Sequence, residues 1–195
     1  MSQDRPEVLV VDDESRLADL FAAWLENGGW TVKTAYDGRT ALEKMSDTVE
    51  IVLLDRRMPG LSGDEVLGEI REEGYDARVV MVTAVDPDFD IIEMGFDDYL
   101  VKPVSKDELL DLVDRVHDRQ EYASDVQEYF SLVSKRSLLQ IEKSSQELEN
   151  SAEYQELQAR IEELEETVDR QVTELEGHED FVGAFRDLPG GSGTE

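Results

Sequence analysis

The first 118 residues alternate short apolar runs with longer segments in which apolar residues recur every three or four positions. Short apolar runs bounded by turn residues are typical of buried strands, and the longer periodic segments are typical of helices that cover a sheet. The runs lie at residues 7–11, 31–35, 51–54, 78–82 and 99–101. The helical segments lie at residues 17–27, 41–45, 64–74, 91–96 and 107–118. This alternation predicts an α/β fold with a doubly wound, five-stranded parallel sheet.

Polar residues with related chemistry follow four of the five apolar runs. Because the carboxyl ends of parallel strands meet at one edge of a sheet, these side chains are expected to converge. Two carboxylates 4 Å apart repel by roughly 4 kcal/mol at an effective dielectric constant near 20, so an acidic cluster indicates a cation, and Mg²⁺ prefers carboxylate oxygens. A threonine hydroxyl and a lysine ammonium suit an incoming phosphoryl group. The pattern predicts a phosphoacceptor site made of Asp12, Asp13, Asp55, Thr83 and Lys102, with Asp55 as the nucleophile.

Each of these residues also has a structural interpretation when it is taken alone. Asp12 and Asp13 are suited to cap the first helix, Lys102 and Pro103 to form a turn, and Thr83 to extend a strand. The joint placement at four strand ends favours the functional interpretation.

The segments VLVVDDE, VLLDRRMPGLSGDEVL, VVMVTAV and DDYLVKPV, all within residues 7–118, resemble the receiver domain of two-component response regulators. The resemblance implies the flavodoxin-like form of the α/β fold. It also implies that Asp13 ligates Mg²⁺ directly, that Asp12 supports the ion through water, and that Asp55 accepts the phosphoryl group and ligates the metal. The backbone carbonyl of Arg57 would complete the ligands that the protein supplies.

The same resemblance assigns the remaining site residues. Thr83 and Lys102 would each bind a phosphoryl oxygen, Tyr99 would be the aromatic switch that turns inward after phosphorylation, and Pro103 would follow a cis peptide bond. One position departs from the family: Arg56 stands where an apolar residue is more common.

The composition of the chain indicates the environment in which the protein works. The chain has 195 residues, no Cys, and a formal net charge of -29, and 13 of its 19 basic residues are Arg. The negative charges of such a chain repel one another and destabilise the folded state, and salt at molar concentration screens this repulsion. We therefore interpret the chain as a protein of a high-salt cytoplasm. Residues 1–7 do not resemble a signal peptide, and the apolar runs are too short to cross a bilayer. A cytoplasmic protein is expected.

The composition changes after residue 120, and we expect a receiver domain at residues 1–120, a helical domain at 121–188 and a disordered tail at 189–195. Apolar residues near one face of residues 126–144 predict an amphipathic helix. A second helix carries an a/d seam, with the residues Leu157, Ile161, Leu164, Val168 and Leu175. A hairpin within the chain and a coiled coil between chains explain this seam equally well. The segment resembles the HalX domain that follows receiver domains in haloarchaea.

These observations predict a response regulator that accepts a phosphoryl group from a sensor histidine kinase, and that catalyses only its own phosphorylation and dephosphorylation. Its output would be protein contact through the helical tail, as a homodimer or with a partner protein. Two alternatives stay open: a transcriptional regulator whose tail binds DNA at high salt, and a phosphorelay intermediate without an output of its own. Because residues 118–195 carry 7 basic and 20 acidic groups, nucleic acid is not the expected partner.

Overall fold

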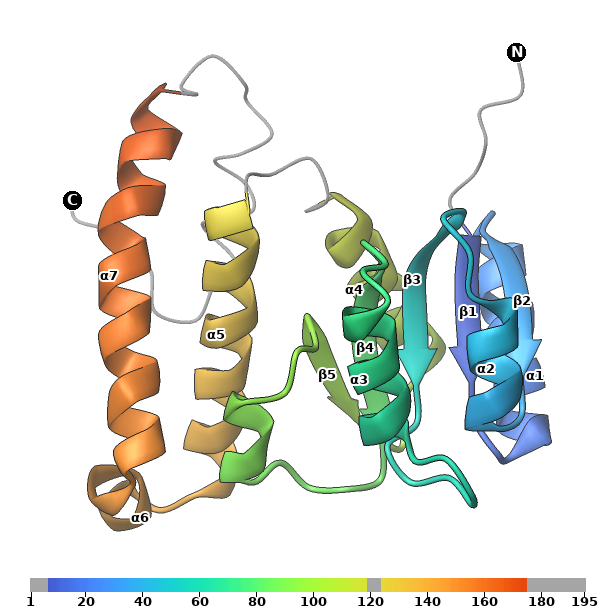
Figure 1. Cartoon of the computed structure of the whole chain (residues 1–195), viewed down its shortest axis with the longest axis horizontal. Coiled ribbons are helices and arrows are strands. Elements are labelled where there is room, and N and C mark those ends of the chain that lie inside the picture. Colours follow the sequence, from blue (N-terminus) through green and yellow to red (C-terminus); the bar gives the residue numbers. More distant parts are fainter. Residues whose placement is uncertain (1–6, 119–123, 175–195) are drawn as a thin grey trace. The chain divides into compact units, whose positions relative to one another are not determined.

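The structure of the chain, a computed structural model, describes residues 7–118 and 124–174 (Figure 1). The chain divides into two compact units, Met1–Tyr122 and Ala123–Glu195, which are described separately below. The domain boundaries expected from the sequence stay predictions, and the disordered tail expected at residues 189–195 lies outside the described residues.

A parallel sheet forms the centre of the first unit. Its strands are β1 (Glu7–Val11), β2 (Thr31–Ala35), β3 (Val49–Leu54), β4 (Arg78–Thr83) and β5 (Asp98–Val101). They lie in the order β2-β1-β3-β4-β5, and every neighbouring pair is parallel. The sequence prediction of a doubly wound five-stranded sheet is confirmed. The order reverses between β1 and β3, and such a reversal is where ligands bind in this class of fold.

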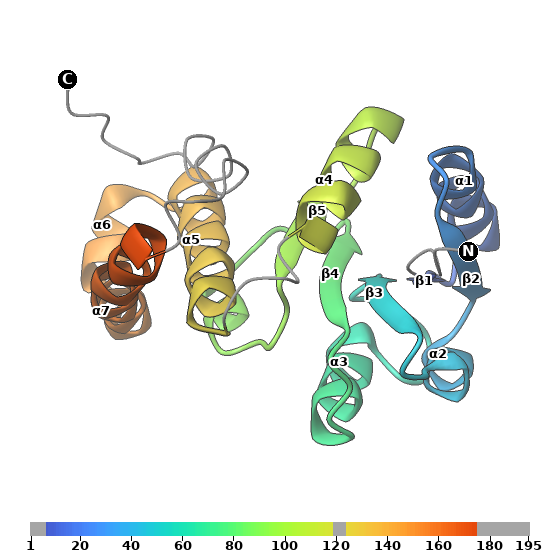
Figure 2. The same cartoon turned by 90° about the horizontal axis from the view of Figure 1, so that it is seen from above.

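Helices cover both faces of the sheet (Figure 2). The helices α1 (Ser15–Asn27) and α4 (Lys106–Asp118) lie on one face, and α2 (Gly38–Lys44) and α3 (Gly63–Glu72) lie on the other. Alternate strand residues point to opposite faces, and on the first face the strands pack against apolar side chains of α1 and α4. The buried core on that face includes Val8, Val10, Phe21, Ile51, Leu53, Val80, Leu109 and Leu112.

The predicted helix at residues 91–96 is wrong. The structure has only a short 3-10 helix, η1 (Phe89–Ile92), in this part of the chain. Arg71 of α3 donates hydrogen bonds to the carbonyl oxygen of Gly95 at 2.7 Å and to the carboxylate of Asp97 at 2.8 Å. The same carboxylate accepts a hydrogen bond from the Val79 amide at 2.7 Å. The Arg71 side chain of α3 and the Val79 amide of β4 therefore hold the chain ahead of β5 in a form that cannot continue the helix.

The start of α3 lies directly against the end of β3. Ser62 and Glu65 form a reciprocal capping box at the helix N-terminus, which fixes where the helix begins. A Cβ atom on Gly63 would lie only 2.1 Å from the carbonyl oxygen of Asp55, so this approach requires glycine. The Gly63 amide also donates a hydrogen bond of 2.9 Å to the carbonyl oxygen of Arg56.

The second unit contains α5 (Ser124–Glu142), α6 (Ser145–Asn150) and α7 (Ala152–Glu174). Figures 1 and 2 show α5 and α7 side by side, joined through α6. The seam residues Leu157, Ile161 and Leu164 are each at most 3% exposed. On α5, the predicted apolar face is buried as well, with Val126, Tyr129, Phe130, Val133 and Leu139. Within the described residues the seam therefore serves a hairpin inside the chain; the side chain of Val168 and all of Leu175 lie outside them.

No helix within residues 7–118 and 124–174 is long and apolar enough to cross a membrane.

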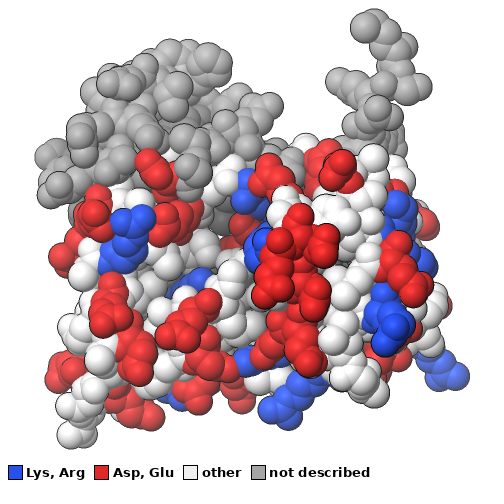
Figure 3. Space-filling model, in the orientation of Figure 1, with Lys and Arg blue, Asp and Glu red and all other residues white. Residues whose placement is uncertain are grey.

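Acidic side chains gather over the middle of the face seen in Figure 3, where α3 lies. The exposed acidic residues of α3 and of the residue that follows it are Asp64, Glu65, Glu69, Glu72 and Glu73. This dense negative surface agrees with the interpretation of the composition as an adaptation to salt.

Candidate functional site

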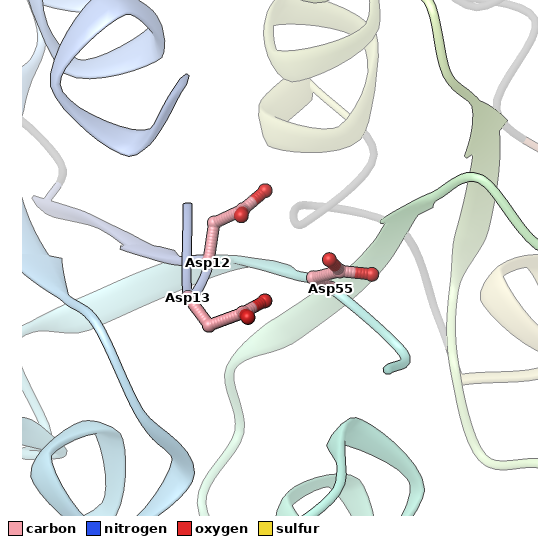
Figure 4. A group of neighbouring side chains, drawn as sticks. All are labelled: Asp12, Asp13 and Asp55. Carbon is pink, nitrogen blue, oxygen red and sulfur yellow. The ribbon is translucent and has the colours of Figure 1, made fainter. Parts of the chain in front are cut away.

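Three carboxylates meet where the strand order reverses. Asp12 and Asp13 follow β1, and Asp55 follows β3 (Figure 4). One carboxylate oxygen from each residue lies within 4.8 Å of the others. Asp12 and Asp55 are buried, with 2% and 7% of their surface exposed, whereas Asp13 is exposed. The acidic cluster that the sequence predicts is therefore present, with one open side.

Backbone hydrogen bonds extend the sheet into the cluster and fix its geometry. The Asp12 amide donates to the carbonyl oxygen of Ala35 at 3.1 Å, and the Asp55 amide donates to the carbonyl oxygen of Val11 at 2.9 Å. The Asp12 carboxylate also accepts a hydrogen bond of 2.9 Å from the amide of Glu14. The two buried acids thus lie on rigid strand ends.

Lys102 neutralises part of this charge. Its Nζ donates hydrogen bonds to Asp12 Oδ2 at 2.6 Å and to Asp55 Oδ2 at 3.0 Å. Burial raises the pKa of Asp12, and its hydrogen bonds with Lys102 and the Glu14 amide only partly offset this. Burial disfavours the ammonium of Lys102, but its hydrogen bonds to the two carboxylates outweigh burial and raise the pKa of Lys102.

The donor set fits a hard divalent cation. One ammonium among three carboxylates leaves two negative charges uncompensated, and the oxygen ligands are those that Mg²⁺ prefers. Asp13, on the exposed side of the cluster, gives such an ion access from solvent. Asp12, Asp13 and Asp55 are therefore the residues that would hold it.

Thr83, the last residue of β4, and Tyr99 of β5 are linked through Val85. Thr83 Oγ1 accepts a hydrogen bond of 3.4 Å from the Val85 amide, and the Tyr99 hydroxyl donates one of 2.6 Å to the Val85 carbonyl oxygen. Tyr99 is only 4% exposed, and its ring lies against Phe96, with ring centroids 5.6 Å apart. The buried ring agrees with the inward position that the sequence prediction gives this residue, and its movement on phosphorylation stays a prediction.

Arg56 is the residue near the site whose partners sequence reasoning missed. Its Nε donates to both oxygens of Asp64 in the first turn of α3, at 3.0 and 3.2 Å, and its Nη2 donates to Asp90 of η1. Burial raises the pKa of Tyr99, and the positive charge of Arg56 acts in the opposite direction. The only feature of the sequence that pointed to Arg56 was its departure from the family pattern, in which an apolar residue is more common at this position.

The two remaining predicted residues lie beside the cluster. The peptide bond between Lys102 and Pro103 is cis, as the resemblance implies. The Arg57 amide donates to Asp55 Oδ1 at 3.3 Å, while its side chain is exposed. The role of the Arg57 carbonyl as a metal ligand stays a prediction.

Comparison with known families matches both parts of the chain. Residues 8–114 match the response regulator receiver domain, and residues 118–185 match the HalX domain. A Haloferax volcanii protein described as a candidate transcriptional regulator is 55% identical over 117 residues. The match covers 60% of this chain and 20% of that protein, so the chain spans about one fifth of the length of this curated relative.

Solved structures resemble the first unit. The receiver domain of the Francisella response regulator 1452 is 31% identical, with a TM-score of 0.55, and the match covers 60% of this chain and all of that one. The Thermotoga maritima response regulator TrrA, solved in complex with Mg²⁺ and BeF, is 35% identical with a TM-score of 0.50. That match covers 56% of this chain and 97% of TrrA.

Proposed function

Since the chain belongs to the response regulator receiver domain family, we propose that it accepts a phosphoryl group on Asp55 from a sensor histidine kinase and signals through a conformational switch. The observation that carries the proposal is the pair of hydrogen bonds from Lys102 to Asp12 and Asp55 inside an acidic cluster at the sheet reversal. This arrangement holds one carboxylate as a nucleophile among groups that bind a metal and a phosphate.

The proposed transfer is a displacement at phosphorus. A carboxylate oxygen of Asp55 attacks the phosphoryl group of a phosphohistidine whose other ring nitrogen is protonated. The bond from phosphorus to the imidazole nitrogen breaks, its electron pair stays on that nitrogen, and the ring leaves as neutral imidazole. Mg²⁺, when bound by Asp12, Asp13 and Asp55, would neutralise charge on the acceptor and on the incoming group. Lys102 would bind a phosphoryl oxygen, and its hydrogen bond to Asp55 supports this role.

In the proposed switch, Val85 connects Thr83 to Tyr99. A phosphoryl oxygen on Asp55 would recruit the Thr83 hydroxyl, which now accepts a hydrogen bond from the Val85 amide. The Val85 carbonyl oxygen is the acceptor for the Tyr99 hydroxyl, so a shift of this one residue reaches both side chains. Phosphorylation would stabilise the buried position of the Tyr99 ring.

Protein contact through the helical unit is the output that we propose, in a cytoplasmic setting, with a second copy or another protein as the partner. The described part of the helical unit supports this over DNA binding: Lys135, in its main basic cluster, is only 4% exposed, and Arg160 is paired with Glu128 and Glu163. The description of the Haloferax volcanii relative favours a transcriptional regulator instead. Specific DNA binding by the full chain in high salt would support that alternative.

The test of the phosphoacceptor uses Asp55→Asn, with Asp19→Asn as a matched control on the surface of α1. Each full-length protein is incubated with Mg²⁺ and a small acyl phosphate donor, and the product is followed by phosphate-affinity electrophoresis. We expect wild type and Asp19→Asn to be phosphorylated and Asp55→Asn to stay unmodified, because only the carboxylate can attack. Phosphorylation of Asp55→Asn at the wild-type level would overturn the proposal.

A further inference from the structure

Arg56 joins two elements that lie far apart in the sequence. Its partners are Asp64, eight residues away at the start of α3, and Asp90, 34 residues away in η1. The Arg56 side chain is only 12% exposed, although those of Asp64 and Asp90 are 45% and 51% exposed. The guanidinium thus lies beneath two surface carboxylates and is partly withdrawn from water, which strengthens ion pairs.

The location of this guanidinium connects the phosphoacceptor to the switch. Arg56 follows Asp55 directly in the chain, and its carbonyl oxygen accepts the hydrogen bond from Gly63 that seats α3 against β3. At its other end, the guanidinium pairs with Asp90 of η1, in the segment between β4 and β5. The same segment contains Val85, whose carbonyl oxygen accepts the hydrogen bond from the Tyr99 hydroxyl. A displacement at Asp55 therefore acts on a side chain that is tied to the segment that holds the switch residue.

The contact geometry depends on the shape of arginine. Nε faces the Asp64 carboxylate, and Nη2 faces Asp90, so two edges of one rigid planar group hold two elements at once. The ammonium of a lysine is a single point of charge and cannot reproduce this fixed pair of directions.

We infer that Arg56 is a positioning residue that clamps η1 to the start of α3, holds Tyr99 in its buried position and so favours the phosphorylated state of Asp55. The inference rests on the proposed function, because it concerns the response of that same site. Loss of the clamp would let η1 move and the ring leave its site, and the site would then bind a phosphoryl group less tightly.

The test measures the affinity of the full-length protein for beryllofluoride, a mimic of the phosphoryl group, by calorimetric titration in excess Mg²⁺ at one salt concentration. We expect Arg56→Gln and Asp90→Asn each to weaken binding by about fivefold, the scale of a partly exposed ion pair and of a modest coupling. The double variant should be no weaker than Arg56→Gln alone, because both changes break the same contact. Arg56→Lys should restore little of the loss.

Two further variants separate this role from a general loss of stability. In a Tyr99→Ala background, Arg56→Gln should have no further effect on beryllofluoride affinity, since the ring that it holds is gone. Arg71→Gln removes an arginine that ties α3 to Gly95 and Asp97 and whose hydrogen bonds do not include Tyr99. This variant should have a lower melting temperature and an unchanged affinity.

Three results would overturn the inference: an unchanged affinity in Arg56→Gln, an equal fivefold loss in the Tyr99→Ala background, or full recovery in Arg56→Lys. Failure of the proposed function looks different. In that case wild type itself would not bind beryllofluoride, or Asp55→Asn would bind it as well as wild type does.

Discussion

Replacement of Lys102 by methionine tests the electrostatics of the acidic cluster. Methionine keeps an unbranched side chain of similar length and removes the charge that now lies 2.6 Å from Asp12 and 3.0 Å from Asp55. In the absence of a metal ion, the variant should lose stability. Its stability in Mg²⁺ should stay close to that of wild type.

The size of the effect follows from the separation of the carboxylates. The ligand oxygens of the cluster lie within 4.8 Å of one another, and two charges at that limit repel by about 3.5 kcal/mol at an effective dielectric constant near 20. Breaking a buried ion pair by removing one partner costs about 3 to 5 kcal/mol. We therefore expect the free energy of unfolding of Lys102→Met to fall by about 3 kcal/mol without Mg²⁺, because Asp12 and Asp55 then face each other with no cation between them.

A divalent cation should offset this loss, since it supplies the positive charge that the lysine supplied. If the stability gap closes in saturating Mg²⁺, thermodynamic linkage requires the variant to bind Mg²⁺ about a hundredfold more tightly, because 3 kcal/mol corresponds to about two powers of ten. Unfolding by urea, with and without Mg²⁺ at one fixed ionic strength, measures both quantities. An equal loss of stability in both conditions, or weaker Mg²⁺ binding by the variant, would refute the reasoning.

Two further predictions concern the backbone near the site and the surface. Gly63→Ala should lower the free energy of unfolding by about 1 to 3 kcal/mol and weaken Mg²⁺ binding. Its Cβ would lie 2.1 Å from the Asp55 carbonyl oxygen, so α3 must shift. The control is Gly68→Ala on the same helix, whose Cβ would have no atom within 4 Å and which should be stabilising by about 0.5 to 1 kcal/mol. Chemical unfolding of both variants and a Mg²⁺ titration check this, and equal effects of the two changes would contradict it. The melting temperature of the full chain, with its net charge of -29, should rise between about 0.1 and 2 M KCl as the acidic surface is screened; a flat profile in scanning calorimetry would contradict the interpretation of the composition.

The sheet could be predicted because strand identity depends on local pattern. Each strand is a short apolar run whose register follows from its neighbours, and the observed bounds of β3, β4 and β5 differ from the predicted ones by at most two residues. The segment at residues 91–96 was mispredicted because its conformation is set by a side chain from another element. Arg71 of α3 donates a hydrogen bond to the Gly95 carbonyl oxygen. Periodicity carries no information about such a contact.

The same distinction holds at the candidate site. The convergence of Asp12, Asp13 and Asp55 follows from the rule that parallel strands end at one edge, and the structure brings their oxygens together. The bridge from Arg56 to Asp64 and Asp90 was outside the reach of sequence reasoning, since it depends on how α3 and η1 pack. The present burial of Tyr99 also could not be read from the sequence, because a switch residue has at least two positions.

The seam of α7 shows how a pattern with two explanations constrains the output. The same a/d spacing serves a hairpin or a coiled coil between chains, and here α5 offers a complementary apolar face only a short helix away. To expose Leu157, Ile161 and Leu164 to a partner, the unit would give up about 1.5 to 3 kcal/mol for each side chain. That total exceeds the 1 to 3 kcal/mol typical of coupling between two sites. A phosphorylation signal of ordinary size would therefore not open this hairpin by itself, and the protein contact that we propose would use the outer, polar faces of α5 and α7.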